Sequence, residues 1–134
     1  MSFTETELYW AAGFLEGEGS FVASSAACRT RPERKTVGVR LSAIQVQMEP
    51  LERLQRMFGG NIRPHTHREG QSPLLRWEVN GNRAVALMFT LWSIMSPRRK
   101  QQIETAIAKW KLNRSHKEGC KEGAVKGWIT RRAA

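Results

Sequence analysis

Two glutamates, Glu16 and Glu18, are the side chains of this chain best suited to chemistry. They close the segment Ala11-Ala12-Gly13-Phe14-Leu15-Glu16-Gly17-Glu18-Gly19, which has the pattern of a helix that ends by presenting a carboxylate. Carboxylate oxygens are the ligands that hard divalent cations such as Mg²⁺ prefer. Taken alone, the same pattern also fits an ordinary amphipathic helix that ends in two solvated glutamates.

The glycines of this helix predict that it packs against a second helix. Thr4 and Glu7 have the spacing of a capping box, so the helix is expected to begin at about Thr4 and to include Gly13 and Gly17. Each glycine costs a helix about 1 kcal/mol relative to alanine, and close approach of two backbones is a reason to keep it. If a second copy packs there, two copies of Glu18 meet, and adjacent carboxylates repel unless they are protonated or bridged by a cation. The sequence therefore predicts a metal site built by helix pairing.

The longer segment Tyr9-Trp10-Ala11-Ala12-Gly13-Phe14-Leu15-Glu16-Gly17-Glu18-Gly19-Ser20-Phe21 resembles the signature of the LAGLIDADG homing endonucleases, in particular their bacterial and phage branch. The resemblance covers roughly residues 4–112. It implies an α+β fold of the order αββαββα, in which helices back a four-stranded antiparallel sheet that lies as a saddle in the DNA major groove. It also implies a site-specific double-stranded DNA endonuclease that uses Mg²⁺ or another divalent cation. Because the chain has one signature and no internal repeat, the resemblance implies a homodimer.

The same resemblance assigns the metal to Glu18 and Gly17. Glu16 and Glu18 stand where the family usually has two aspartates, and the extra methylene of glutamate moves a bound metal by about an ångström. Since the bacterial branch often has glutamate, we interpret this difference as compatible with activity. The residues that the resemblance places at the dimer interface are Ala12, Gly13, Glu16 and Gly17.

Two further catalytic roles follow from the resemblance. Gln47 corresponds to the family's glutamine near the active-site water network, with Gln45 as the alternative. Arg99 is the expected basic residue over the cleavage site, where a cation stabilises the charge of the phosphate or polarises the attacking water. Arg98 and Lys100 flank it, and generic phosphate contact is the alternative role for these residues.

Length, charge and cysteine content limit the function classes. The chain has 134 residues, enough for one compact domain, and a net charge of +10. Residues 98–134 carry 11 Lys/Arg and 3 Glu, which favours a polyanionic partner, most simply nucleic acid. No apolar run has the length of a membrane span, and no signal-peptide pattern opens the chain. Cys28 and Cys120 lack a Cys-x-x-Cys partner, which favours a reducing intracellular compartment over a zinc site or a disulfide framework. The resemblance to the bacterial and phage branch implies the cytoplasm of a bacterial or phage-infected cell.

Periodicity and turn residues predict the remaining elements. Alternation predicts strands, Gly59-Gly60 ends a short helix, and Ser96-Pro97 has the pattern of an N-cap followed by a first-turn proline. The third helix is apolar nearly all round and is expected to be buried. The expected elements are strands over about 20–26 and 36–47, a helix to 58, a hairpin of 61–67 and 74–80 around Gly70, and helices over about 83–95 and 97–113.

Polar side chains gather on one predicted face of the sheet. Around Ala43 the apolar phase jumps to Ile44 and Val46, and a one-residue β-bulge there would explain the jump and put Gln45 and Gln47 on the polar face. A row of donors and acceptors is what base-edge readout needs, although a half-exposed strand facing water has the same pattern. The residues predicted to contact DNA are Ser20, Ser24, Arg40, Ser42, Gln45, Arg63, His65, His67, Arg76, Glu78, Asn80, Arg98 and Lys100.

The chain after the last helix has a different composition. Residues 114–134 are rich in Gly, Lys and Arg and have no period, which predicts a flexible basic tail outside the domain of residues 1–113. Without a pattern that could read bases, the tail is expected to contact phosphates.

Two other functions stay open at this point. One is a nucleic-acid-binding protein of the same fold that does not cleave, either a maturase with intron RNA as partner or a DNA-binding regulator. The other is a structural basic protein, such as a ribosome-associated domain. The presence of both carboxylates in Glu-Gly-Glu-Gly favours the enzyme.

Overall fold

The computed structural model describes residues 2–27, 30–31, 33, 35–65, 69–70 and 73–113. The predicted succession αββαββα is confirmed, and one more helix occupies residues 97–113. His67, both cysteines and the predicted tail over residues 114–134 lie outside the described residues. The elements are α1 (Glu5–Glu18), β1 (Gly19–Ala27), β2 (Lys35–Gln45), α2 (Met48–Phe58), β3 (Asn61–His65), β4 (Leu74–Asn80) and α3 (Gly81–Trp92).

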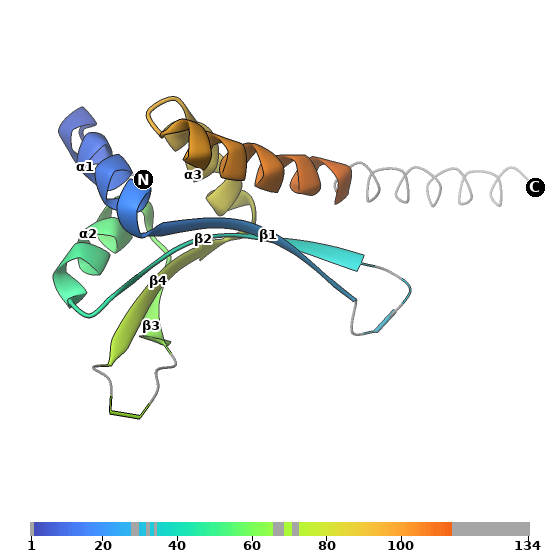
Figure 1. Cartoon of the computed structure of the whole chain (residues 1–134), viewed down its shortest axis with the longest axis horizontal. Coiled ribbons are helices and arrows are strands. Elements are labelled where there is room, and N and C mark those ends of the chain that lie inside the picture. The colour runs from blue at the N-terminus through green and yellow to red at the C-terminus, as the bar shows by residue number, and fades with distance from the viewer. Residues whose placement is uncertain are drawn as a thin grey trace, which may run out of the picture.

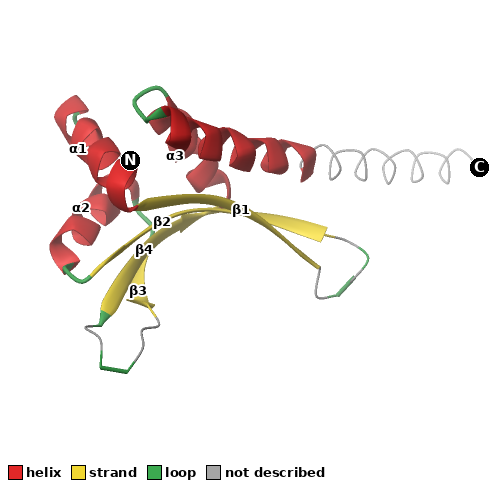
Figure 2. Ribbon diagram, viewed as in Figure 1, coloured by secondary structure: helices red, strands yellow, loops and turns green. Residues whose placement is uncertain are grey.

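The fold has two layers. Its four strands pair antiparallel in the order β1-β2-β4-β3, and the sheet bends into an arch (Figure 1). The helices lie on the convex side of the arch, and the concave side is open (Figure 2). The core lies between the layers and contains Leu15, Leu41, Leu54, Trp77 and Leu87, all fully buried. Among the described helices, none is long and apolar enough to cross a membrane.

Local signals set the helix ends as predicted. The hydroxyl of Thr4 accepts a hydrogen bond from the Glu7 amide at 3.1 Å, and the Glu7 carboxylate accepts one from the Thr4 amide at 3.0 Å. This capping box satisfies amides that the first turn of a helix leaves unpaired. α2 ends at Gly59 and Gly60, whose φ angles of 75° and 92° favour glycine.

Gly19 lets α1 turn into β1 without a connecting loop. Its amide donates to the Leu15 carbonyl, which closes the last turn of α1. A Cβ atom at this position would lie 2.5 Å from the same carbonyl oxygen. The fourth residue of Glu-Gly-Glu-Gly is therefore required for close packing of backbone on backbone.

We expect Gly19→Ala to lower the free energy of unfolding by roughly 1–3 kcal/mol, because the clash is with backbone that cannot rotate away. Gly38→Ala is the matched control, since its Cβ would meet only the Ser24 hydroxyl at 4.0 Å. Urea unfolding followed by circular dichroism measures both variants. Equal midpoints for the two would contradict this account of Gly19.

The predicted β-bulge near Ala43 is wrong. β2 keeps one continuous register with both neighbours, from Gly19↔Ala43 on β1 to Gln45↔Leu75 on β4. Of the two residues that mark the jump in apolar phase, Ile44 is still in β2 and lies on the open face opposite Arg76, whereas Val46 has left the sheet because β2 ends at Gln45. Gln45 is consequently in phase with the core-facing residues of β2, and the predicted grouping of Gln45 and Gln47 with Arg40 and Ser42 does not form.

The helix α3 is also less buried than its composition predicts. Phe89 and Trp92 are 55% and 38% exposed, and both line a groove between α3 and the helix over residues 97–113. The residues of α3 that enter the core are Ala84, Val85, Leu87, Met88 and Leu91.

Candidate nucleic-acid interface and active site

The open face of the sheet carries the polar side chains of alternate residues. In β1 the burial pattern alternates, with Phe21 and Ala23 buried and Ser20, Val22 and Ser24 exposed. The strand register extends this alternation across the sheet, because directly paired residues share a face. One row of the open face consists of Ser20, Ser42, Glu78 and Asn61, and the next contains Val22, Arg40 and Asn80.

Arginines lie on both sides of the row that contains Ser20 and Ser42. On one side, Arg63 on β3 lies directly opposite Arg76 on β4; on the other side, Arg40 on β2 pairs with Asn80. None of the three forms a hydrogen bond or an ion pair with another described residue, and the Nε groups of Arg40 and Arg76 are shielded from solvent without a partner. Like charges directly opposite one another destabilise a sheet. This arrangement therefore favours a polyanion bound on the open face.

The strand register also changes which residues belong to the set predicted to contact DNA. His65 pairs with Leu74 and shares the face of Arg63, as predicted. Asn61 lies on the same face and is absent from the predicted set, although its two-residue spacing from Arg63 on a strand indicates this position. Gln45 is half-buried and out of phase with Arg40, so its predicted place on the DNA-facing side is a misassignment.

The carboxylate end of α1 lies at the edge of this open face. Glu18 is the last residue of α1, and both Glu18 and Gly17 are exposed. Because Gly19 pairs with Ala43, the end of α1 lies beside β2 two residues before that strand ends at Gln45, and Gln47 follows two residues later as the N-cap of α2. Gln47 is exposed and its side chain makes no capping bond to α2.

A carboxylate beside a main-chain carbonyl is a donor set that fits a hard cation, and the carbonyl end of a helix adds negative partial charge. Glu18 and Gly17 provide this combination at the end of α1. Within the described part of the chain, no three His, Cys, Asp or Glu side chains come together to hold a metal ion.

The outer strip of α1 is free in the single chain. Gly13 and Gly17 are exposed, and a Cβ atom built on either would meet no described atom within 4 Å. Ala12 is different: it is 5% exposed and lies in the core, so its predicted place at a dimer interface is wrong. The exposed small-residue strip of α1 thus consists of Gly13 and Gly17.

Glu16, whose side chain is 36% exposed, contacts the start of the last helix. Its carboxylate accepts hydrogen bonds from the Ser96 amide at 2.6 Å and the Ser96 hydroxyl at 2.9 Å. The hydrogen bond from the Ser96 amide is the main reason that the pKa of Glu16 lies below its ordinary value, and the charges of Arg99 and Arg98 act in the same direction. Glu16, predicted at the dimer interface, is therefore already engaged within the chain.

Arg99 packs beside the contact between Glu16 and Ser96. Its side chain is buried, and its Nε and Nη2 groups donate to the main-chain carbonyl of Glu16 at 3.0 and 2.9 Å. Its Nη1 group donates to Gln102 at 2.9 Å. Arg98 is exposed and lines a groove between β1 and the helix over residues 97–113, whereas the Lys100 ammonium lies 4.7 Å from the ring centre of Trp92. Of the three predicted cations, Arg98 is the one presented on the side of the sheet.

Comparison with solved structures relates this arrangement to known proteins, whereas comparisons with protein-family models and with curated proteins found no match. The chain superimposes on the group I intron-encoded homing endonuclease I-CeuI in complex with DNA, with a TM-score of 0.67 and 19% identity over 86% of this chain and 58% of that chain. The chain has the LAGLIDADG fold.

Other structures with the LAGLIDADG fold are similar to the same extent. The homing endonuclease I-CvuI in complex with DNA has a TM-score of 0.61 and 21% identity over 76% of this chain and 64% of that chain. The LAGLIDADG meganuclease I-CpaMI bound to uncleaved DNA has a TM-score of 0.61 and 17% identity over 86% of this chain and 40% of that chain. The chain spans 58% of the length of the I-CeuI chain and 64% of the length of the I-CvuI chain.

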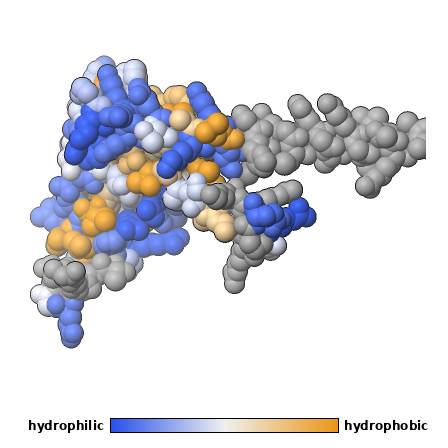
Figure 3. All heavy atoms as spheres, turned by 45° about the vertical axis from the view of Figure 1, so that its right-hand side comes forward, coloured by the Kyte–Doolittle hydropathy of each residue, from blue (hydrophilic) through white to orange (hydrophobic). Residues whose placement is uncertain are grey.

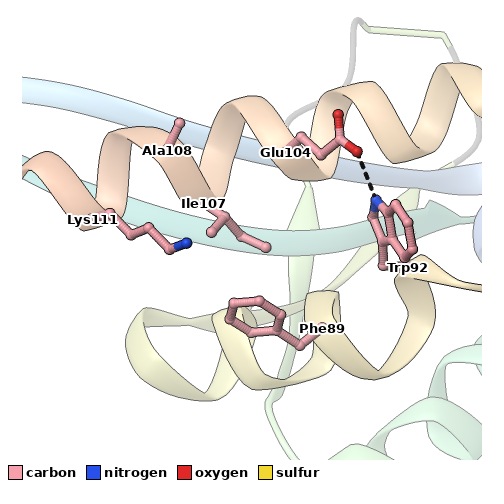
Figure 4. Close-up of a pocket in the computed structure, with 6 residues that line it drawn as sticks. All are labelled: Phe89, Trp92, Glu104, Ile107, Ala108 and Lys111. Atoms are coloured by element: carbon pink, nitrogen blue, oxygen red, sulfur yellow. Dashed lines mark hydrogen bonds between the residues drawn. The ribbon is translucent and has the colours of Figure 1, made fainter.

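The LAGLIDADG fold of this chain also has an apolar groove away from the predicted site. It has a volume of about 420 Å³ and lies between α3 and the helix over residues 97–113, where Phe89 and Ile107 point toward each other (Figure 4). The indole of Trp92 donates to the Glu104 carboxylate at 3.1 Å along one side. In the space-filling view, hydrophobic residues form separate patches among hydrophilic ones (Figure 3). None of the residues predicted to bind DNA or metal lines this groove.

Proposed function

We propose that this chain is a homing endonuclease that cleaves double-stranded DNA at a specific site, with a divalent metal and as a homodimer. The observation that carries this proposal is the placement of Glu18. An exposed carboxylate at the end of α1 stands at the edge of an open sheet face whose arginines have no described partner. The neighbours I-CeuI and I-CvuI are homing endonucleases in complex with DNA, which supports DNA as the partner.

The open face would bind the major groove of DNA. Arg40, Arg63 and Arg76 would contact phosphates or guanine edges, since a guanidinium can form two hydrogen bonds to either. Serine, asparagine and histidine side chains between them provide donors and acceptors for other base edges. In the polar row nearest to Glu18, the exposed Ser20 and Asn61 and the half-buried Glu78 would read bases, whereas the predicted DNA contact Ser42 is buried.

Glu18 and the Gly17 carbonyl would hold the metal ion. When bound, Mg²⁺ would supply an activated water and stabilise the leaving 3′ oxygen. Two I-CvuI complexes were crystallised with 2 mM Mg and 2 mM Ca, which is consistent with a divalent cation. Gln47 would orient the attacking water, and Arg98 would stabilise negative charge on the phosphate.

A second copy of the chain would complete the site. The strip of Gly13 and Gly17 permits two copies of α1 to touch, and their ends would bring together two Glu18 side chains. Each subunit would then read half of the DNA site, as a two-fold symmetric dimer does.

A two-stage selection tests the function. DNA duplexes with a randomised segment are selected for binding to the full chain in Ca²⁺, and the selected duplexes are then incubated in Mg²⁺. We expect breaks in both strands near the centre of the selected site, and none in EDTA. A protein that selects a sequence but leaves it intact in Mg²⁺ and Mn²⁺ is the non-cleaving binding protein, and the proposed activity then fails.

Replacing an arginine of the open face should weaken DNA binding without lowering the stability of the fold. Arg76→Gln should weaken DNA binding about tenfold and reduce the dependence of the dissociation constant on salt. The same variant should leave the free energy of unfolding unchanged or raise it by up to about 0.5 kcal/mol, because the repulsion from Arg63 is removed. Fluorescence anisotropy and urea unfolding measure the two effects.

Arg56→Gln is the matched control, since Arg56 is an exposed arginine in the last turn of α2, in the helix layer. It removes the same charge and should leave DNA binding nearly unchanged. If both variants weaken binding equally, the open face is not the DNA-binding surface.

A further inference from the structure

Two helix ends hold each other where α1 meets the helix over residues 97–113. The carbonyl end of α1 carries negative partial charge and receives the Arg99 guanidinium. The amide end of the other helix carries positive partial charge and receives the Glu16 carboxylate through the Ser96 amide. The Ser96 hydroxyl joins the two, because it donates to Glu16 and accepts from the Arg99 amide at 3.3 Å. Each charge is thus placed at the helix end that it stabilises.

Arg99 is not accessible to a phosphate in this arrangement. Its side chain is 7% exposed, and its Nε, Nη1 and Nη2 groups all donate to protein acceptors. Its guanidinium also lies 5.7 Å from the ring centre of Phe21, on the core side of β1. Contact with DNA would require Arg99 to give up these hydrogen bonds, whereas the neighbouring Arg98 is already exposed.

The atom that Arg99 holds is two residues from Glu18. The last turn of a helix has few intrahelical bonds and is the part that frays first. A two-pronged hydrogen bond to the Glu16 carbonyl restrains this turn from the side, in addition to the bond from the Gly19 amide to Leu15. The orientation of the Glu18 carboxylate depends on the same turn.

We propose that Arg99 is a positioning residue for Glu18, which acts with Glu16 and Ser96 to fix the end of α1 and does not contact DNA. This assignment rests on the proposed function, since the role of Glu18 as a metal ligand comes from it. It replaces the expected role of Arg99 as the basic residue over the cleavage site. Residues that orient metal ligands affect metal affinity by about 10- to 100-fold when they are changed.

Hydrogen exchange tests the positioning without metal or DNA. In Arg99→Met and in Arg99→Lys, the Gly19 amide should exchange about tenfold faster or more, while the Leu41 amide in the core of β2 keeps its rate. Lysine should not rescue, because one ammonium cannot reproduce the paired Nε and Nη2 contacts on the Glu16 carbonyl. Arg56→Met on α2 is the control and should change neither rate.

Binding measurements then separate positioning from phosphate contact. With the DNA selected in Ca²⁺, Arg99→Met and Arg99→Lys should keep the salt dependence of the wild type but need about 10- to 100-fold more Mn²⁺ for half-saturation by calorimetry. Arg98→Met should behave in the opposite way, with a salt slope that is lower by about 1 and a smaller change in metal affinity. Ser96→Ala removes only the hydroxyl link and should show a weaker form of the Arg99 phenotype, even if Arg99→Met folds poorly.

The outcomes distinguish the two proposals. A lower salt slope in Arg99→Met, or full rescue by Arg99→Lys, would show that Arg99 binds phosphate and would overturn its positioning role. Unchanged exchange of the Gly19 amide in both Arg99 variants would overturn it too. Faster exchange in the variants of a protein whose wild type cuts no selected DNA would leave the helix-end contact established and the endonuclease function rejected.

Discussion

Glu18→Gln is expected to reduce cleavage of the selected DNA in Mg²⁺ by about 10²–10³-fold or more. Glutamine has nearly the same shape as glutamate but lacks the negative charge that holds a divalent cation. Because Glu18 is exposed and has no described hydrogen-bond partner, the substitution should leave folding unchanged. Cleavage is measured as the single-turnover rate at saturating protein.

DNA binding by Glu18→Gln, unlike cleavage, should not be reduced. In the absence of metal, Glu18→Gln should bind DNA as tightly as the wild type or more tightly, because a negative charge near the phosphates is gone. The matched control is Glu52→Gln on the exposed side of α2, which should keep full cleavage. If Glu18→Gln and the wild type cut equally fast, Glu18 is not the metal ligand and the proposed site is wrong.

Signals that act within a few residues predicted the fold well. The capping box of Thr4 and Glu7, the Gly59-Gly60 stop and the Ser96-Pro97 start each involve neighbours in sequence, so their physics is complete in the sequence itself. The strand Leu74–Asn80 was predicted with its bounds because its two-residue alternation matches burial on one face. Local chemistry therefore determines most of the elements that carry the open face.

The predictions were wrong where strand pairing or contacts between residues far apart in sequence determine the position of a side chain. The apolar phase of residues 37–46 does not distinguish a bulge from a strand that ends, and only the register with β1 and β4 decides. The contact of Glu16 with Ser96 and Arg99 joins residues 80 and 83 positions apart, and no sequence spacing indicates it. The family signature assigned Ala12 to an interface, but burial in the core of the single chain overrules that role.

The proposed pairing of two copies of α1 also depends on a contact between residues that sequence spacing does not reveal, and Gly13→Leu tests it. Gly13 is exposed, and a Cβ atom at this position would meet no described atom within 4 Å, so the single chain has room for a side chain to begin here. Leucine also favours the helix by about 0.8–1 kcal/mol over glycine. The folded monomer should therefore be as stable as the wild-type monomer or more stable.

The dimer should not survive this change. A leucine side chain at the point where two backbones touch would hold the two copies of α1 apart, and the two Glu18 residues with them. We expect light scattering to give the mass of one chain, 15.3 kDa, for Gly13→Leu and of two chains for the wild type. Cleavage of both strands should be lost, while the open face keeps its weak affinity for half of the DNA site.

Ala86→Leu on the exposed side of α3 provides the control, because it adds an exposed leucine to a helix that the proposed interface does not include. It should remain a dimer and cut DNA. Gly13→Ala should lie between the two, since one methyl group separates the backbones less than a leucine side chain does. A Gly13→Leu protein that stays dimeric and fully active would show that α1 is not the interface, and the reason for two glycines in this helix would have to lie elsewhere.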